Sequence, residues 1–260
     1  MPIMLLLSDP IALCNFVVMR MRTFLLFLCL SKLAAAQQIQ TLYLLPGQGS
    51  DHRIYSHTTF PEGVDTVHLH FIMPLENESM HAYAARMSAQ IDTTRPFAIA
   101  GVSLGGMVAT EMTDFIHPQL VILLSSASSS EEIPDSYAQQ REYMLYRWIP
   151  AGVIKYSTFL LQPMFEPDRR KERAICNDMI SDKSALFMKR AVHLIVTWER
   201  TEAQNAGLAI FQIHGSADQT LPLKNIAANL IISDGSHMMT LTKAAEISQA
   251  IQQAFTTHQQ

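Results

Sequence analysis

The chain carries its strongest structural signal in one short segment, Ala98-Ile99-Ala100-Gly101-Val102-Ser103-Leu104-Gly105-Gly106. An apolar run at residues 96–102, typical of a strand buried on both faces, leads directly into a run with helical spacing. In the pattern G-x-S-x-G at such a turn, Gly101 and Gly105 let the strand and the helix approach closely, while the Oγ atom of Ser103 projects clear. The pattern predicts a nucleophilic serine at Ser103.

Short apolar runs alternate with amphipathic stretches along most of the chain, which is typical of a parallel sheet covered by helices. The apolar runs predict strands at residues 39–45, 64–71, 96–102, 120–124, 208–213 and 229–232. The amphipathic spacing predicts helices at residues 79–91, from 104 to about 116, and from about 240 to 255. We therefore predict an α/β fold with a mostly parallel sheet of about six strands flanked by helices.

The region from about residue 127 to 207 departs from this rhythm. It contains no strand-like run bounded by turns, and its helical runs are interrupted at Pro150, Pro163 and Pro167. We predict that this region is an inserted helical lid. Its large apolar side chains either pack as ordinary core, which is the usual role of such residues, or line an apolar substrate pocket. They are Met144, Trp148, Tyr156, Phe159, Met164, Phe165, Met179, Phe187, Met188 and Trp198.

A nucleophilic serine needs a general base with a pKa near neutrality and an acid that orients this base. Asp218 and His237 each follow a predicted strand, and the order Ser, Asp, His along the chain is the one expected for loops carried by this type of sheet. Asp234 is the alternative acid, but it lies only three residues from His237, so Asp218 is preferred. His214 is interpreted as a residue that packs in its loop.

With these motifs in this order, the sequence resembles the α/β-hydrolase family from Ile39 onward. The resemblance rests on G-V-S-L-G-G at residues 101–106, H-G-S-A-D-x-x-x-P at 214–222 and G-S-H at 235–237. It implies an oxyanion hole formed by the backbone N–H groups of Gln48 and Leu104. The family usually has His-Gly in the first of these two loops, whereas this chain has Pro46-Gly47-Gln48-Gly49, so Gly47 and Gly49 are alternative donors.

The resemblance also implies the activity of a serine hydrolase that cleaves an ester or related acyl bond. The reaction would use a Ser-His-Asp triad and an acyl-enzyme intermediate, and no metal or other cofactor is expected. Thioesterases, lactonases, C–C hydrolases and aminopeptidases share this triad, so the substrate stays open beyond a small acyl compound with an apolar part. A non-catalytic binding protein on the same fold is the alternative from another class. Such proteins typically lose a triad member, and this chain retains Ser103, Asp218 and His237.

The composition excludes several other classes. A chain of 260 residues with 48% apolar and 16% charged residues can fold around a core. Its net charge of −4, without a basic run, argues against binding to nucleic acid. The three cysteines lack the spacing of a disulfide framework or a zinc knuckle. His68 and His70 alternate on one face of a predicted strand, but no third ligand is near them in the sequence, so no metal site is predicted.

Residues 19–36 have the features of a secretory signal peptide. Arg20 and Arg22 precede a short apolar run, and Ala34 and Ala36 fit the small-x-small rule for signal-peptidase cleavage. The apolar run is shorter than the roughly 20 residues that cross a bilayer, so no stable membrane span is expected after processing.

We therefore expect a leader at residues 1–36, with the signal peptide at about 19–36, and an α/β-hydrolase domain at residues 37–260. This organisation predicts a periplasmic or secreted protein. A membrane-anchored or cytoplasmic protein is the alternative.

Overall fold

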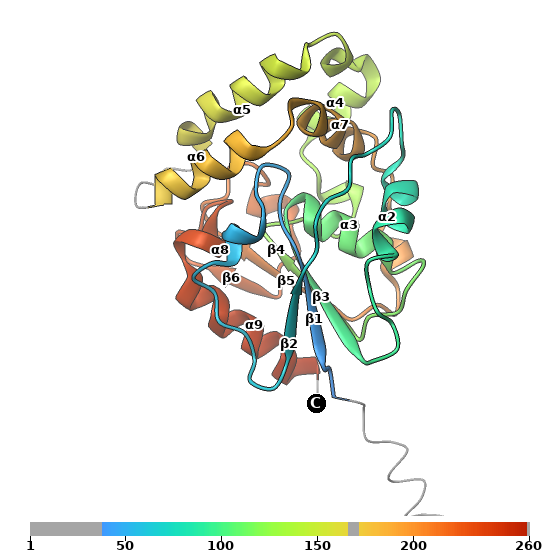
Figure 1. The fold of residues 1–260 in the computed structure, drawn as a ribbon, viewed down its shortest axis with the longest axis vertical. Helices are drawn as coiled ribbons and strands as arrows, with labels where there is room; N and C mark the ends of the chain where they lie inside the picture. Colours follow the sequence, from blue (N-terminus) through green and yellow to red (C-terminus); the bar gives the residue numbers. More distant parts are fainter. Residues whose placement is uncertain (1–37, 166–171, 259–260) are drawn as a thin grey trace, which may run out of the picture. The chain divides into compact units, whose positions relative to one another are not determined.

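Six strands form one sheet in the computed structural model, which describes residues 38–165 and 172–258 (Figure 1). The strands are β1 (Thr41–Leu45), β2 (Asp65–His68), β3 (Phe97–Val102), β4 (Leu120–Leu124), β5 (Ile210–Gly215) and β6 (Leu230–Ile232). All pairings are parallel, and the strand order is β2-β1-β3-β4-β5-β6. The predicted six-stranded, mostly parallel sheet is confirmed.

The inner strands consist mostly of apolar residues because both faces of the sheet are covered. Every residue of β1, β3 and β4 is buried. Along β1, Leu42 and Leu44 belong to one hydrophobic core while Tyr43 and Leu45 belong to the other, as the two-residue period of a strand requires. The edge strand β2 is exposed along its whole length, which fits its more polar sequence.

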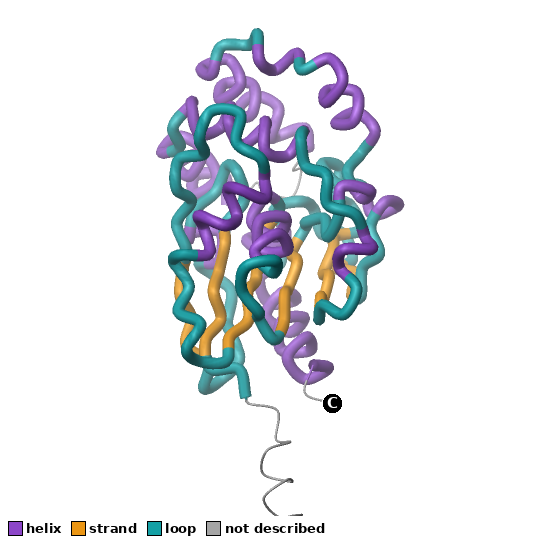
Figure 2. The backbone as a smooth tube through the Cα atoms, turned by 90° about the vertical axis from the view of Figure 1, so that its right-hand side faces the viewer, coloured by secondary structure: helices purple, strands orange, loops and turns teal. Residues whose placement is uncertain are grey.

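Helices cover both faces of the sheet (Figures 1 and 2). On one face α2 (Met80–Ser88) packs against α3 (Leu104–Met112), and both contribute to the core that contains Tyr43 and Leu45. On the other face α9 (Ala244–His258) packs against β4 and β6.

The C-terminal helix differs from the prediction of one helix over about residues 240–255. The structure divides it into α8 (Met239–Thr242) and α9, because Lys243 has a non-helical backbone with φ −125° and ψ 39°. The break allows α8 to pack against η1 (His52–Tyr55) while α9 packs against the sheet.

The register of the strands brings their carboxyl ends to one edge of the sheet. The aligned pairs at this edge are Leu45 with Gly101, Val102 with Leu124, Leu124 with Ile213, and Gly215 with Ile232. The loops that follow β1, β3, β4, β5 and β6 therefore lie next to one another. In open parallel sheets this edge is where ligands bind.

Helices fill the region between β4 and β5, and Figures 1 and 2 show them beyond the carboxyl ends of the strands. They are η2 (Ser130–Glu132), α4 (Asp135–Tyr143), η3 (Leu145–Arg147), α5 (Ala151–Phe165), α6 (Arg173–Asp182), α7 (Ala185–Val196) and η5 (Glu202–Asn205). Pro150 precedes α5, as expected. Pro163 instead lies inside the last turn of α5, so the break predicted there is wrong. Pro167 lies outside the described residues, and the lid function of the region stays a prediction.

The predicted leader at residues 1–36 also lies outside the described residues. Within the part of the chain that the structure describes, no helix combines the length and the apolar character needed to cross a bilayer.

Candidate active site

The turn between β3 and α3 holds Ser103 in a strained conformation. Its φ of 52° lies in the left-handed region, which non-glycine residues rarely adopt. Close backbone contacts account for the flanking glycines. A Cβ atom on Gly101 would lie 2.3 Å from the carbonyl carbon of Gly105, and one on Gly105 would lie 2.4 Å from the carbonyl oxygen of Pro46.

Hydrogen bonds hold this turn from two directions. The Ser103 N–H donates to the carbonyl oxygen of Leu124 at 3.0 Å. The Ser103 carbonyl oxygen accepts from the Gly106 N–H at 2.9 Å and from the Oγ of Ser126 at 2.6 Å. Ser126 follows β4, so the neighbouring strand positions the turn through a contact that sequence spacing does not reveal.

Three side chains from three strand ends form one chain of hydrogen bonds. The Oγ of Ser103 lies 2.8 Å from Nε2 of His237, and Nδ1 of His237 lies 2.8 Å from Oδ2 of Asp218. Because a carboxylate only accepts, Nδ1 carries the hydrogen, and Nε2 of the neutral ring can accept a proton from the serine. The structure thus brings together the three residues predicted for the triad, whereas Asp234 is exposed on its turn.

Asp218 is buried, and its negative charge is stabilised by its surroundings. Its Oδ1 accepts the N–H groups of Thr220 and Leu221, each at 2.9 Å. Burial by itself favours the protonated form, but the charge of His237 and the hydrogen bonds around the carboxylate outweigh it and hold the pKa of Asp218 well below its ordinary value. Asp218 is therefore ionised at neutral pH.

His214 is a completely buried neighbour of the same carboxylate. Its Nε2 lies 2.7 Å from the carbonyl oxygen of Leu221 and 3.3 Å from Oδ2 of Asp218. Because a carbonyl oxygen only accepts, Nε2 carries a hydrogen that both oxygens can share. Its Nδ1 has no hydrogen-bond partner among the described residues. The sequence predicted only a packing role for His214. The structure shows in addition that His214 contacts Asp218, the acid that orients His237.

The loop after β1 lies against the serine. A Cβ atom on Gly47 would lie 3.5 Å from the Cβ of Ser103. The Gly47 N–H donates to the Oγ of Ser50 at 2.8 Å, so this alternative oxyanion donor is already engaged.

The N–H groups of Gln48 and Leu104 are those predicted for the oxyanion hole. Neither donates to another group within residues 38–165 and 172–258, and the same holds for the alternative, Gly49. The Gln48 side chain donates from Nε2 to the carbonyl oxygen of Met188 at 2.9 Å, which ties this loop to α7. Leu104 is the first residue of α3, where the helix dipole places a partial positive charge. The oxyanion role of the two amides stays a prediction.

A cavity of about 500 Å³ adjoins Ser103 and His237. The helical region between β4 and β5 contributes nine of its lining residues: Ser136, Tyr137, Ser157, Thr158, Cys176, Ile180, Met188, Val192 and Ile195. The loops after the strands contribute most of the others. Among the described residues no Asp, Glu, Lys or Arg lines the cavity, and the polar groups they contribute include hydroxyls, amides and the imidazole of His237.

The Met and aromatic residues noted in the predicted lid divide into several groups. Met188 lines the cavity, whereas Phe187 and Trp198 are buried in the core. Trp148 and Tyr156 do neither, since they are 86% and 67% exposed.

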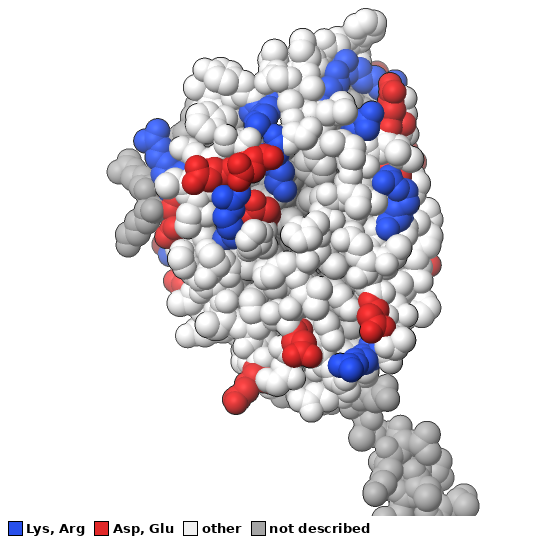
Figure 3. All heavy atoms as spheres, viewed as in Figure 1, with Lys and Arg blue, Asp and Glu red and all other residues white. Residues whose placement is uncertain are grey.

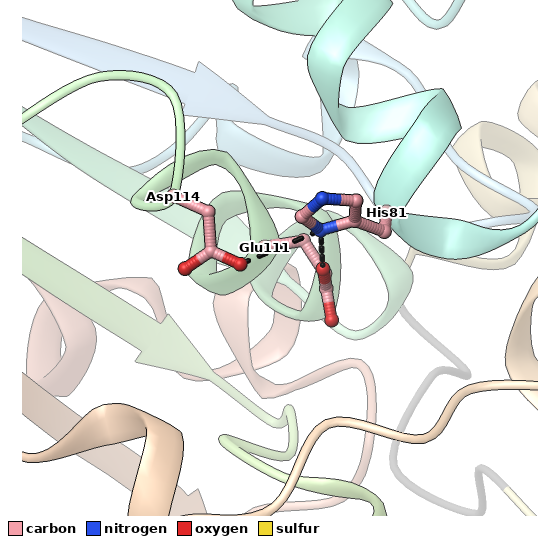
Figure 4. Close-up of side chains that lie close together, drawn as sticks. All are labelled: His81, Glu111 and Asp114. Atoms are coloured by element: carbon pink, nitrogen blue, oxygen red, sulfur yellow. Dashed lines mark hydrogen bonds and ion pairs between the residues drawn. The ribbon is translucent and has the colours of Figure 1, made fainter.

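Figure 4 shows a second cluster of titratable groups, formed by His81, Glu111 and Asp114. Nδ1 of His81 lies 3.0 Å from Oε2 of Glu111 and 3.4 Å from Oδ2 of Asp114. The buried guanidinium of Arg200 lies 3.1 Å from the same Asp114 oxygen, and the indole N–H of Trp198 donates to Oε1 of Glu111 at 2.7 Å. With Arg200 supplying the positive charge, the cluster is an ion-pair network that fastens the end of α3.

Comparison with known proteins places the fold. No protein-family model matches the chain, and no curated protein matches it. Among solved structures, MenH from S. aureus gives a TM-score of 0.68 at 16% identity, covering 87% of this chain and 97% of that one. The enol-lactonase from Burkholderia xenovorans LB400 gives 0.64 at 13%, covering 84% and 92%. A thermophilic esterase from Thermogutta terrifontis gives 0.57 at 14%, covering 86% and 92%.

At sequence identities this low, the similarity to these structures shows a shared fold and nothing more specific. The chain has the α/β-hydrolase fold, and the architecture implied by the sequence motifs is confirmed. This fold supports many chemistries, so the function depends on the site.

Proposed function

We propose that the protein is a serine hydrolase that cleaves an ester or related acyl bond. The observation that carries this proposal is the continuous hydrogen-bond chain from Ser103 through His237 to the ionised Asp218, at a strained turn beside a cavity. Ser103 attacks the acyl carbon, and Nε2 of His237 takes its proton. Asp218 keeps the imidazole in the required tautomer and stabilises its charged form.

The negative charge that develops on the substrate oxygen is stabilised by the N–H groups of Gln48 and Leu104. Collapse of the tetrahedral intermediate expels the alcohol, which receives its proton from His237. A water molecule, deprotonated by the same histidine, then releases the acid and regenerates Ser103.

The cavity indicates an uncharged acyl group. A carboxylate or ammonium group on the acyl chain would lose its hydration without gaining a partner of opposite charge from residues 38–165 and 172–258, because none of their charged side chains lines the cavity. We therefore propose neutral, partly apolar acyl esters as the substrate class.

Covalent labelling with a fluorophosphonate probe tests the nucleophile. We expect the wild-type protein to be labelled and the Ser103→Ala variant to remain unlabelled. Ser136→Ala is the matched control, because it removes another hydroxyl from the cavity and should leave labelling intact. Labelling of Ser103→Ala at the wild-type rate contradicts the assignment, and a wild-type protein without labelling supports the non-catalytic binding protein.

A pair of esters tests the substrate class. The p-nitrophenyl ester of hexanoic acid and the mono-p-nitrophenyl ester of adipic acid have the same chain length but differ in a terminal carboxylate. We expect kcat/KM to be at least about tenfold higher for the hexanoate, since an unpaired buried charge costs more than 1.4 kcal/mol. Equal values contradict the proposed preference without touching the assignment of Ser103.

We also propose export, with cleavage after Ala36. N-terminal sequencing of the protein from its own host should give a chain that begins at Gln37. Recovery of an uncleaved terminus from the cytosolic fraction would contradict this proposal.

A further inference from the structure

The segment at residues 143–165 has an unusual charge composition. It contains no Asp or Glu and two basic residues, Arg147 and Lys155, although the whole chain has a net charge of −4. It covers the end of α4, η3 and α5. Most of its other residues are apolar or aromatic.

Many of these apolar side chains face outward. The exposed ones, which together we call the aromatic surface, are Tyr143, Leu145, Trp148, Ile149, Val153, Tyr156, Phe159 and Leu160. Single exposed apolar residues are common on soluble proteins, but eight within an 18-residue stretch are unusual and indicate an interaction surface.

Helix α5 is oriented with its apolar side outward. Val153, Tyr156 and Leu160 are spaced by three and four residues, so they share one face of the helix, and all three are more than half exposed. Ser157 and Thr158 line the cavity instead. The helix also buries Ile154, but the outward apolar stripe is unusual, because the apolar stripe of a surface helix normally faces the protein core.

Three basic side chains lie within or next to the aromatic surface. Lys189 donates from Nζ to the carbonyl oxygens of Arg147 and Ile149, on either side of Trp148. Lys155 donates to the carbonyl oxygen of Ser181. Within the described residues, Arg147, Lys155 and Lys189 form no ion pair with a carboxylate. Figure 3 shows mainly uncharged side chains over α5, with both basic and acidic side chains next to this area.

We propose that the aromatic surface docks on an anionic lipid bilayer. Trp and Tyr favour the interface between headgroups and acyl chains, and Lys and Arg beside them interact with anionic headgroups. A second copy of the chain is a poorer partner, because a symmetric dimer through this face would bring the three cations of each copy together. Docking would place α5, and with it one wall of the cavity, at the membrane surface.

The fluorescence of the two tryptophans provides a direct measurement of docking. Trp148 is 86% exposed, whereas Trp198 is buried and hydrogen-bonded to Glu111. The chain has no other tryptophan, so residues 1–37 contribute no signal even if they touch lipid. Fluorescence of the full chain is recorded as vesicles are added, either of phosphatidylcholine alone or with a third phosphatidylglycerol.

With the anionic vesicles we expect a blue shift of the emission and co-sedimentation of the protein. The Trp148→Phe variant should lose the blue shift, because Trp198 is already buried. Replacing Arg147 and Lys155 by Gln should weaken binding roughly 25-fold, at about fivefold for each charge near the surface. The double variant Trp148→Ser, Tyr156→Ser should also weaken binding. Ile231→Ser, which removes an exposed apolar side chain from β6, is the matched control and should bind normally.

Three results would overturn the proposal. One is a wild-type emission that does not change with anionic vesicles, and another is unchanged binding by the Trp148→Ser, Tyr156→Ser variant. The third is a blue shift that rises with protein concentration in the absence of vesicles, which would assign the aromatic surface to self-association. Fluorophosphonate labelling of each variant, together with its Trp198 emission, verifies that the fold and the serine site are intact. Failure of docking is therefore distinguishable from failure of the proposed hydrolase function.

Discussion

A Cβ atom added to Gly101 would lie 2.3 Å from backbone atoms, whereas one added to Gly152 in α5 would meet no atom within 4 Å. The same contrast extends to their surroundings. Around Ser103 the backbone is held by hydrogen bonds from two neighbouring segments, while α5 presents large apolar side chains to solvent. The position of the reactive groups is thus fixed by backbone contacts at the strand ends. The outer helices are less constrained by packing, so their exposed side chains can serve binding.

The largest expected effect lies in the tightly packed region, at Asp218. In an Asp218→Asn variant the amide oxygen can still accept the N–H groups of Thr220 and Leu221, so the amide nitrogen faces His237. That nitrogen donates, which favours the tautomer of His237 that cannot take the serine proton. We expect kcat to fall about 10⁴-fold with the near-UV circular dichroism unchanged. A loss of less than tenfold, measured with a p-nitrophenyl ester, would contradict the role of Asp218.

The next largest effect is expected at the glycines of the turn that carries Ser103. Gly101→Ala places its methyl group against backbone atoms of Gly105 and Gly106, which cannot move aside as a flexible side chain could. We expect the free energy of unfolding in urea to fall by about 3 kcal/mol or more, or the protein not to accumulate. Gly49→Ala is the matched control, since its Cβ would make an ordinary 3.6 Å contact with Ile180. Similar losses for both variants would show that the close approach at Gly101 is not what matters.

His214 tests how far the ordered network extends. A His214→Leu variant removes the shared hydrogen next to Asp218, and hydrogen bonds to charged groups contribute about 1.5–3 kcal/mol. We expect kcat/KM to fall roughly 10- to 100-fold and the acid limb of its pH profile to move. His214→Gln, which retains an N–H donor, should recover part of the activity. If His214 only packs, both variants should change stability while the shape of the pH profile stays the same.

Much of this site was predictable because its signals are local in sequence. Ser103, Asp218 and His237 each stand in a short loop directly after an apolar run, and the glycines around the serine mark a tight turn. Parallel strands bring such loops to one edge of the sheet, so their spatial proximity follows from the fold class. The inner strands β1, β3 and β4 were predictable because both faces of the sheet are covered there and each is a largely apolar run. The exposed edge strand β2 was predictable from its alternating pattern instead.

The features that the sequence did not predict depend on contacts between segments that are far apart in sequence. Ser126 reaches Ser103 only because β4 lies beside β3, and the ion-pair network of His81 and Arg200 forms only in the folded chain. In the outer helices, composition predicted helix without predicting which face is buried. Trp148 and Tyr156 therefore fitted both a core and a pocket interpretation, and they occupy neither place.

A smaller effect is expected on the stability of the same packed region when the pH is lowered. The pKa of Asp218 is lower in the folded protein than its ordinary value of 3.8, so the unfolded chain binds more protons as the pH falls past that value. The stability contributed by Asp218 is therefore complete above about pH 5 and decreases at lower pH. We expect the difference in free energy of unfolding between the wild type and Asp218→Asn to shrink from about pH 5 towards pH 3. A difference that grows over this range would contradict the charged state of Asp218.

The smallest expected effect lies in the loosely packed region and has the opposite sign. Gly152 stands in the first turn of α5 with open space where a Cβ would go, and its φ is not positive. Alanine limits the unfolded chain more than glycine does, so Gly152→Ala should raise the free energy of unfolding by about 0.4–1 kcal/mol. The measurement is a urea titration beside Gly101→Ala under identical conditions. The kinetics with a soluble ester should not change, because Gly152 does not line the cavity. A destabilised Gly152→Ala protein would mean that α5 is packed against something at this position, and the contrast between the two regions would then not hold.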